Sequence, residues 1–232
     1  MRYRAIHTKK PKDDYCFIFY NGFGTDFRYW KSLLPYFAGH ECVLLTEDYL
    51  NQGDNCSDEV LKKLVHGRKL IGISHSLGYM KLCKLMEKCD FFNLQKIIAI
   101  EGFSNFLGSN LSLRCARKSS LDFMKACYAV RPITTLVNFQ RMCGEFFPQI
   151  PNKVSKAQLM VDLDLLDESV ESPSIPHLIL SSIDDPIIPF PIIEDNFRNI
   201  SDSKIVYTSR CSHLLGMKNP KFVYSEISKF LN

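Results

Sequence analysis

Short runs of β-branched and aromatic residues recur along the first hundred residues and again near the end of the chain, and turn residues separate them. Runs of this length and composition are typical of buried β-strands. The pattern predicts strands over residues 15–20, 42–46, 69–73, 96–100, 177–181 and 204–208. A weaker run over residues 3–7 predicts one more strand, which we expect beside the first of these.

Helical patterns fall between the predicted strands. They cover residues 27–37, 58–66, 77–88 and 225–231, and Ser57 is expected to cap the second of them because two acidic residues follow it in the first turn. Strands that alternate with helices predict an α/β fold, in which a mostly parallel central sheet carries helices on both faces.

Residues 104–170 break this alternation, because they contain no convincing strand. We expect them to form a helical cap inserted after the strand that ends at Ile100, within a single domain of residues 1–232. Insertions of this kind lie over the carboxyl ends of the strands, where open α/β sheets bind their ligands. The cap is therefore expected to cover the functional site.

The run Ser74-His75-Ser76-Leu77-Gly78 joins a predicted strand to a predicted helix. It resembles the nucleophile elbow of the α/β-hydrolases, in which a strained turn lifts a serine hydroxyl above the sheet edge. We favour Ser76 as the nucleophile, because the small residues Ser74 and Gly78 flank it at the two close approaches. A register centred on Ser74, with Gly72 before it, and a serine-rich helix cap without chemistry are the alternatives.

An acid and a base follow the serine in the order that this fold requires. Asp185, with Asp184 as the alternative, lies in a turn after the strand over 177–181, although an ordinary turn before Pro186 explains the pattern equally well. His213 lies in a loop between the last strand and the terminal helix, so it is the predicted base. We interpret His75, beside the serine, as packing within the elbow.

The sequence Asn21-Gly22-Phe23-Gly24 follows the strand over 15–20. The backbone amides of Phe23 and Leu77 are the expected oxyanion donors, since two fixed N–H groups stabilise the charge that develops during acyl transfer. Many α/β-hydrolases have histidine where this chain has Asn21, and asparagine still provides hydrogen bonds that brace the loop.

The composition and the charge exclude several classes of protein. The chain has 232 residues, of which 46% are hydrophobic, and its net charge of +4 is too small to indicate nucleic-acid binding. No apolar run approaches the length of a membrane-spanning helix. The nine cysteines show no close pairing, which favours reduced thiols in the cytoplasm. We expect a monomer with no metal, no cofactor and no membrane contact.

Charge is unevenly distributed in the predicted cap. Residues 111–141 contain six cations and one acid, whereas residues 159–171 contain five acids and no cation. The cationic segment is a candidate surface for an anionic partner, and its four arginines are the better candidates because guanidinium binds carboxylate or phosphate with two hydrogen bonds. These are Arg114, Arg117, Arg131 and Arg141. Apolar cap residues line an acyl pocket or form the ordinary core of the cap: Phe103, Phe106, Leu121, Phe139, Met142 and Phe146.

The glycine-aromatic-glycine loop over 22–24, the elbow at Ser76 and the acidic turn at Asp185 together resemble the pimeloyl-acyl-carrier-protein methyl ester esterases of biotin synthesis. The resemblance implies an α/β-hydrolase with Ser76, Asp185 and His213 as the catalytic residues. It also implies an apolar acyl groove, and a cap whose basic residues hold an acidic acyl-carrier protein. A thioesterase or general short-chain esterase would use the same three residues, and a lyase would use the same serine and histidine without an acyl-enzyme. A non-catalytic binding protein with this fold is a further alternative, left open by Ser74 and Asn21.

Overall fold

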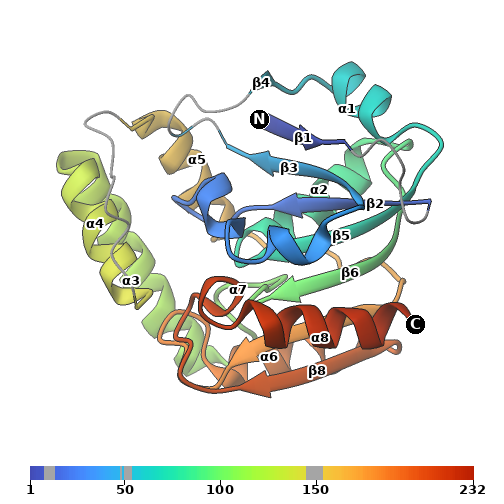
Figure 1. Ribbon diagram of the computed structural model, residues 1–232. Coiled ribbons are helices and arrows are strands. Elements are labelled where there is room, and N and C mark those ends of the chain that lie inside the picture. Colours follow the sequence, from blue (N-terminus) through green and yellow to red (C-terminus); the bar gives the residue numbers. More distant parts are fainter. Residues whose placement is uncertain (8–13, 48, 50–53, 145–153) are drawn as a thin grey trace.

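The computed structural model describes residues 1–7, 14–47, 49, 54–144 and 154–232. Its centre is one eight-stranded sheet in which the predicted parallel strands lie side by side (Figure 1). The spatial order of the strands is β4 (Asp54–Asn55), β1 (Arg2–Ile6), β3 (Glu41–Thr46), β2 (Tyr15–Tyr20), β5 (Lys69–His75), β6 (Leu94–Ile100), β7 (His177–Ser182) and β8 (Ser203–Thr208).

The six main strands match their predicted positions to within two residues at either end. The predicted neighbour of the first strand is wrong, because β1 pairs antiparallel with β3 and not with β2. Both edges of β2 already carry parallel partners, β3 and β5, so no backbone groups remain there for β1.

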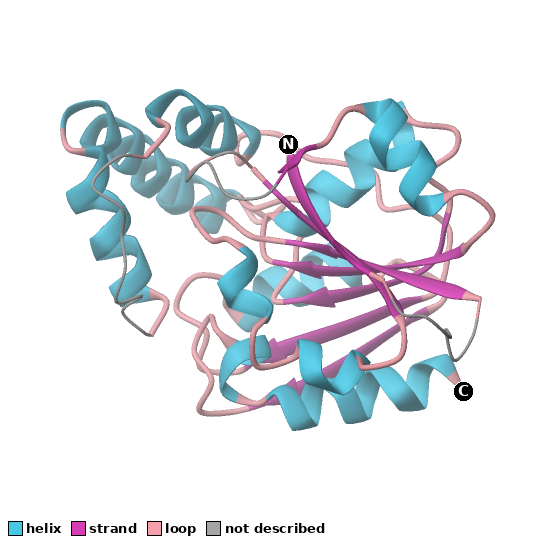
Figure 2. Cartoon of the chain, turned by 45° about the horizontal axis from the view of Figure 1, so that its top comes forward, coloured by secondary structure: helices cyan, strands magenta, loops and turns pink. Residues whose placement is uncertain are grey.

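Helices cover both faces of the sheet (Figures 1 and 2). They are α1 (Asp58–Val65), α2 (Gly78–Lys88), α6 (Phe190–Phe197), α7 (Leu215–Lys218) and α8 (Pro220–Leu231). Ser57 caps α1 as predicted, since its Oγ accepts a hydrogen bond from the amide of Val60 at 3.3 Å.

The helix predicted over residues 27–37 is wrong in type. The segment forms two short 3-10 helices, η1 (Phe27–Trp30) and η2 (Leu34–Phe37). Pro35 explains the difference, because it has no N–H to donate and its ring obstructs the carbonyl four residues earlier in an α-helix.

The inserted segment contains three helices, α3 (Leu111–Val130), α4 (Pro132–Met142) and α5 (Lys156–Leu165). In Figure 2 the arrowheads of the parallel strands point towards these helices, so the cap stands at the carboxyl ends of the strands. A bridge between Asn105 and Ser169 joins the two ends of the insertion.

None of the helices in the part of the chain that the structure describes is both long and apolar enough to cross a bilayer. All nine cysteines are free, and six of them are buried.

Candidate active site

The elbow is a strained turn between β5 and α2. Ser76 adopts a φ of 53°, in the left-handed region that non-glycine residues seldom occupy. Gly78 is required because a side chain there would overlap the carbonyl oxygens of Tyr20 and Asn21. Ser74, the alternative nucleophile, lies within β5, where its hydroxyl donates to the carbonyl of Ile98 at 3.2 Å.

The structure brings the three predicted side chains together over the sheet edge. His213 Nε2 lies 3.0 Å from Ser76 Oγ, and His213 Nδ1 lies 2.7 Å from Asp185 Oδ2. Each of the three residues exposes 5% of its surface or less. A hydrogen-bonded series therefore runs from a hydroxyl through an imidazole to a buried carboxylate, which is the arrangement that transfers a proton from a nucleophilic serine.

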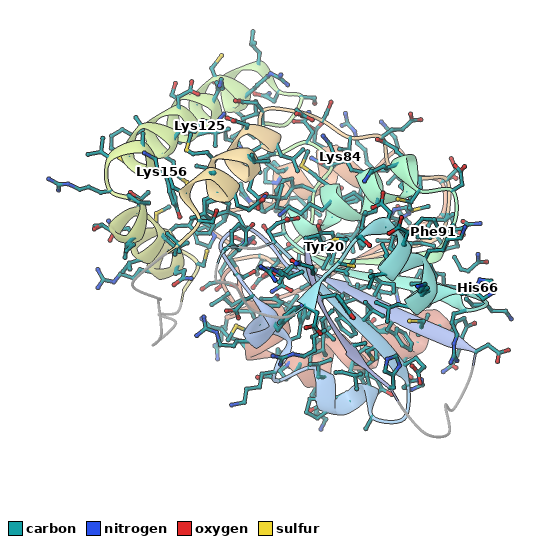
Figure 3. All side chains as sticks on the ribbon, turned by 90° about the horizontal axis from the view of Figure 1, so that it is seen from above. Tyr20, His66, Lys84, Phe91, Lys125 and Lys156 are labelled. Atoms are coloured by element: carbon teal, nitrogen blue, oxygen red, sulfur yellow. The ribbon has the colours of Figure 1, made fainter. Side chains whose placement is uncertain are left out.

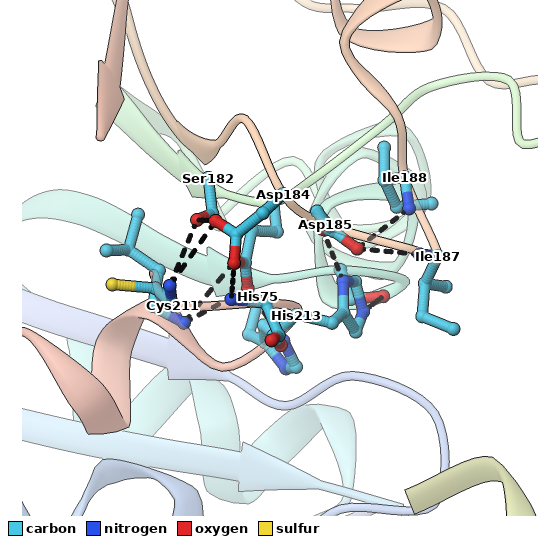
Figure 4. Close-up of polar contacts among 12 residues, drawn as sticks. His75, Ser182, Asp184, Asp185, Ile187, Ile188, Cys211 and His213 are labelled. Atoms are coloured by element: carbon cyan, nitrogen blue, oxygen red, sulfur yellow. Dashed lines mark hydrogen bonds and ion pairs between the residues drawn. The ribbon is translucent and has the colours of Figure 1, made fainter. Parts of the chain in front are cut away.

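The two adjacent aspartates have different partners (Figure 4). Besides His213, Asp185 accepts hydrogen bonds from the amides of Ile187 at 2.7 Å and Ile188 at 3.0 Å, so its orientation is fixed by its own turn. Asp184 instead accepts from the hydroxyl of Ser182 at 2.5 Å and the amide of Ser212 at 3.3 Å.

The hydrogen bond from Ser182 is the main cause that lowers the pKa of Asp184. Through its contact with the amide of Ser212, Asp184 supports the loop that carries His213, whereas Asp185 contacts the imidazole itself. Geometry separates the two acids that the sequence left as alternatives.

The loop after β2 passes directly over the elbow. A Cβ on Gly22 would lie 2.8 Å from His75 Nδ1 and 3.0 Å from Ser76 Cβ, so only glycine allows this approach. Asn21 braces the loop, accepting from Trp30 Nε1 at 2.8 Å and donating to the carbonyl of Asp26.

Leu77 follows Ser76 directly, and Phe23 follows Gly22, the residue of the loop that lies against the elbow. Within the described ranges, neither amide has a hydrogen-bond acceptor. Both amides are therefore free to donate, as oxyanion donors must be.

A buried pair of titratable groups lies beneath the loop that carries His213. His75 stacks on Tyr29 with ring centres 3.9 Å apart, and its Nε2–H donates to the backbone carbonyl of His213 at 3.1 Å. Glu101 is fully buried, lies 3.5 Å from His75 Nε2, and accepts from the amide of Leu215 at 3.3 Å.

Burial, and then the charge of His213, holds the pKa of His75 well below its usual value. Burial, and then the negative charge of Asp185, raises the pKa of Glu101 well above its usual value. Burial thus favours the neutral form of each group, and both support the histidine loop through its backbone. Sequence reasoning missed Glu101, although an acid directly after the apolar strand β6 was a usable signal.

Donor atoms of His75, Glu101 and His213 lie within 4.8 Å of one another, the one such group among the described residues. Both ring nitrogens of His213 already contact Ser76 and Asp185. A metal ion here would have to displace one of those contacts, so the donor set does not fit a resident metal.

An apolar cavity of about 680 Å³ opens beside Ser76 beneath the cap. Five of the predicted pocket residues line it, namely Phe103, Phe106, Leu121, Phe139 and Met142. The sixth, Phe146, lies outside the described residues. The cavity reaches the surface near Phe123 and Met142, which line it yet expose 73% and 60% of their surface.

The cationic residues of the cap do not form one surface. Lys125 of α3, labelled in Figure 3, contacts Asp164 at 2.7 Å and Asp167 at 2.6 Å, and Lys118 contacts Asp167 at 2.8 Å. The cationic and acidic segments thus partly neutralise each other. Arg117 lines the cavity, while Arg114, Arg131 and Arg141 are exposed.

The C-terminal end of α4 contacts two loops of the site, and sequence reasoning missed these contacts. Gln140 Nε2 donates to the carbonyl of Gly24 at 3.2 Å, and the amide of His213 donates to the carbonyl of Cys143 at 3.1 Å. Phe139 packs edge-on against Phe23 with ring centres 5.3 Å apart. The cap therefore touches both the oxyanion loop and the histidine loop.

No family model matches the chain, and no curated protein sequence is similar enough to indicate kinship. Solved structures do match over nearly the whole chain. An esterase from Exiguobacterium antarcticum has a TM-score of 0.76 at 12% identity, with 99% of this chain and 95% of that chain covered. A bromoperoxidase from Bacillus anthracis has a TM-score of 0.76 at 13% identity, with 99% and 94% covered. MenH from S. aureus has a TM-score of 0.70 at 13% identity, with 99% and 97% covered.

At these identities the likeness shows the fold and not the reaction. The chain has the α/β-hydrolase fold, as its sequence predicts.

Proposed function

We propose that the protein is a serine hydrolase that cleaves carboxylic esters. The observation that carries the proposal is the hydrogen-bonded series from Ser76 through His213 to Asp185, whose serine lines an apolar cavity together with Phe23 and Leu77. No cofactor takes part in this chemistry.

The reaction proceeds in two halves. His213 Nε2 takes the proton of Ser76 Oγ as the oxygen attacks the ester carbonyl, and the amides of Phe23 and Leu77 stabilise the oxyanion. The alcohol leaves with the proton that His213 returns, and the acyl group stays on Ser76. Water, deprotonated by His213, then releases the carboxylate and restores the serine hydroxyl.

The finer proposal is that the substrate is the methyl ester of a pimeloyl chain on an acyl-carrier protein, in the cytoplasm. Methanol is a small leaving group, and a cavity of about 680 Å³ with a mainly apolar lining suits a linear acyl chain. The exposed Arg114 and Arg131 are the residues that we assign to the acidic carrier. We propose that the protein acts as a monomer.

Three substrates test the proposal: a carrier-linked methyl ester, a carrier-linked thioester and a small chromogenic ester. We expect the carrier-linked ester to give the highest kcat/KM. A higher value on the thioester would make the protein a thioesterase, and a higher value on the small ester would make it a general esterase.

The carrier contact has its own test. The double variant Arg114→Glu/Arg131→Glu is expected to lower kcat/KM on the carrier-linked ester about tenfold, more at low salt than at high salt, because exposed charges are screened. Arg68→Glu, an exposed change just before β5 and so at the opposite end of the strand from Ser76, is the control. An unchanged rate in the double variant would remove the physical support for the carrier.

Growth of a biotin-requiring strain that lacks its own esterase tests the biological role. Rescue by wild type but not by Ser76→Ala is the expected result. Rescue by both would remove the catalytic proposal, and rescue by neither would remove the assignment to biotin synthesis.

A further inference from the structure

The loop that follows β2 is packed tightly against the cap. The ring of Phe23 meets Tyr128 of α3 and Phe139 of α4 edge-on, with ring centres 5.6 Å and 5.3 Å away. Gly24 lies so close to α4 that a Cβ there would be 2.5 Å from Leu136 Cδ1. Two helices of the cap therefore pack on the residue whose amide is the expected oxyanion donor.

Within this loop, the direction of the Phe23 amide depends on the carbonyl of Gly22. The two groups belong to one planar trans peptide unit, in which the N–H and the C=O point in opposite directions. The carbonyl of Gly22 accepts two hydrogen bonds from Thr25, one from its hydroxyl at 3.0 Å and one from its amide at 3.4 Å. Whatever holds Thr25 therefore also sets where the Phe23 N–H points.

The cap holds the next peptide unit of the same turn. The amide of Thr25 and the carbonyl of Gly24 share this unit, and Gln140 Nε2 of α4 donates to that carbonyl at 3.2 Å. Gln140 is buried, so the contact is shielded from water. Two peptide units thus connect the side-chain amide of Gln140 with the N–H of Phe23 by hydrogen bonds in series. Each bond of such a series polarises the next, which makes the last N–H a stronger donor.

We propose that Gln140 is a positioning residue of the reaction, which orients and polarises the Phe23 amide from the cap. The inference rests on the proposed function, and it makes the docked cap a part of the oxyanion site. An oxyanion donor is needed only when charge develops in the transition state. Its displacement therefore lowers kcat and leaves the binding of the unreacted ester unchanged.

Gln140→Met tests this role, because methionine is also long and unbranched but cannot donate. Oε1 of Gln140 accepts no hydrogen bond within the described ranges, so the change removes the contact with Gly24 and no other polar contact described there. On methyl octanoate we expect kcat to fall about tenfold, less than for complete loss of a donor, and KM to change less than about twofold. A higher KM at constant kcat would mean that Gln140 only shapes the cavity, and would overturn the proposal.

Gln95→Met is the matched control. It makes the same change at an exposed position near the start of β6, at the opposite end of that strand from the site, and should leave kcat and KM unchanged.

Thr25→Val breaks the series at its second step, because it removes the hydroxyl that holds the carbonyl of Gly22. Alone it should lower kcat about tenfold at constant KM, and it tests the series even if Gln140→Met does not fold. In the double variant the loss should be smaller than the product of the two single losses, because both changes act on the same N–H. Fully multiplicative losses, or full kcat in Thr25→Val, would overturn the series.

The rate at which a fluorophosphonate labels Ser76 gives a readout that needs no ester turnover. The phosphoryl oxygen gains negative charge as the serine attacks, so labelling should be about tenfold slower in Gln140→Met and unchanged in Gln95→Met. Equal labelling rates in Gln140→Met and wild type would overturn the positioning role and leave the esterase proposal standing. Slower labelling of Gln140→Met, with a wild type that hydrolyses no ester, would remove the proposed function and keep the positioning role.

Discussion

The sheet edge and the cap are built in opposite ways. At the edge, Ser76, Asp185 and His213 are almost fully buried, and backbone groups fix the turn of each. In the cap, large apolar side chains such as Phe123 and Met142 line the cavity and remain exposed, and Arg117 is the one charged residue among the described residues that line it. The comparison teaches that the strand ends hold the residues of the proposed chemistry rigidly, whereas the cap supplies most of the cavity wall beside them.

The cap contacts the sheet domain at two separate places, the end of α4 and the helix α5. The end of α4 contacts the site through Gln140 and the carbonyl of Cys143. At α5, Asp162 accepts a hydrogen bond at 2.6 Å from Nζ of Lys81 of α2, and Glu47 lies 3.5 Å from the same Nζ. Burial raises the pKa of Asp162 well above its usual value and lowers the pKa of Lys81 to about 8. One attachment thus touches the reacting groups, and the other anchors the cap to the sheet domain.

The largest expected effect is on kcat, and it distinguishes the adjacent residues Asp184 and Asp185. Asp185→Asn should lower kcat about 10³- to 10⁴-fold, because the amide no longer holds His213 in the tautomer that accepts a proton. Asp184→Asn changes the same side chain one residue earlier and should lower kcat less than about tenfold, since Asp184 contacts Ser182 and the loop that supports His213, and not the imidazole. Steady-state kinetics on one ester measures both, and equal losses would contradict the assignment.

Gly22→Ala is expected to have the next largest effect. The added methyl would press on His75 and Ser76 and displace the loop that carries the Phe23 amide, so kcat should fall about 10²-fold, as for loss of one oxyanion donor. Gly67→Asn is the control, because nothing lies within 4 Å of a Cβ there and asparagine tolerates its φ of +71°. A Gly22→Ala variant with full activity would show that the loop is not part of the site.

The smallest effect concerns stability and pH. The raised pKa of Glu101 means that the folded protein keeps a proton that the unfolded chain releases above the usual glutamate value of 4.5, so stability from this group is lost as pH rises. Glu101→Gln removes that dependence. Its Tm relative to wild type should therefore rise by a few degrees between pH 4 and pH 8, by calorimetry. A constant difference would show that Glu101 titrates normally.

Much of the sheet edge could be predicted because its signals are local. The strand runs, Gly78 beside the elbow and the order of Ser76, Asp185 and His213 are all properties of short segments or of chain order. The break in the helix predicted over 27–37 also has a local signal, since Pro35 lies within this segment.

The rest depends on contacts between segments distant in the sequence. Spacing places Arg114 and Arg117 one turn apart, and nothing in α3 tells which of them meets Phe106 and Ile187. The same holds for Gln140, whose partner is the carbonyl of Gly24 more than a hundred residues earlier. Burial of Glu101 likewise follows from the loop around Leu215 and not from its neighbours in the chain.

The most direct test of the central claim is covalent labelling of the folded protein with a fluorophosphonate, followed by intact mass and peptide mapping. We predict one label per chain on Ser76, no label in Ser76→Ala, and much slower labelling in His213→Gln. A folded protein that takes up no label, or that takes it up on Ser74 or elsewhere, would contradict the account.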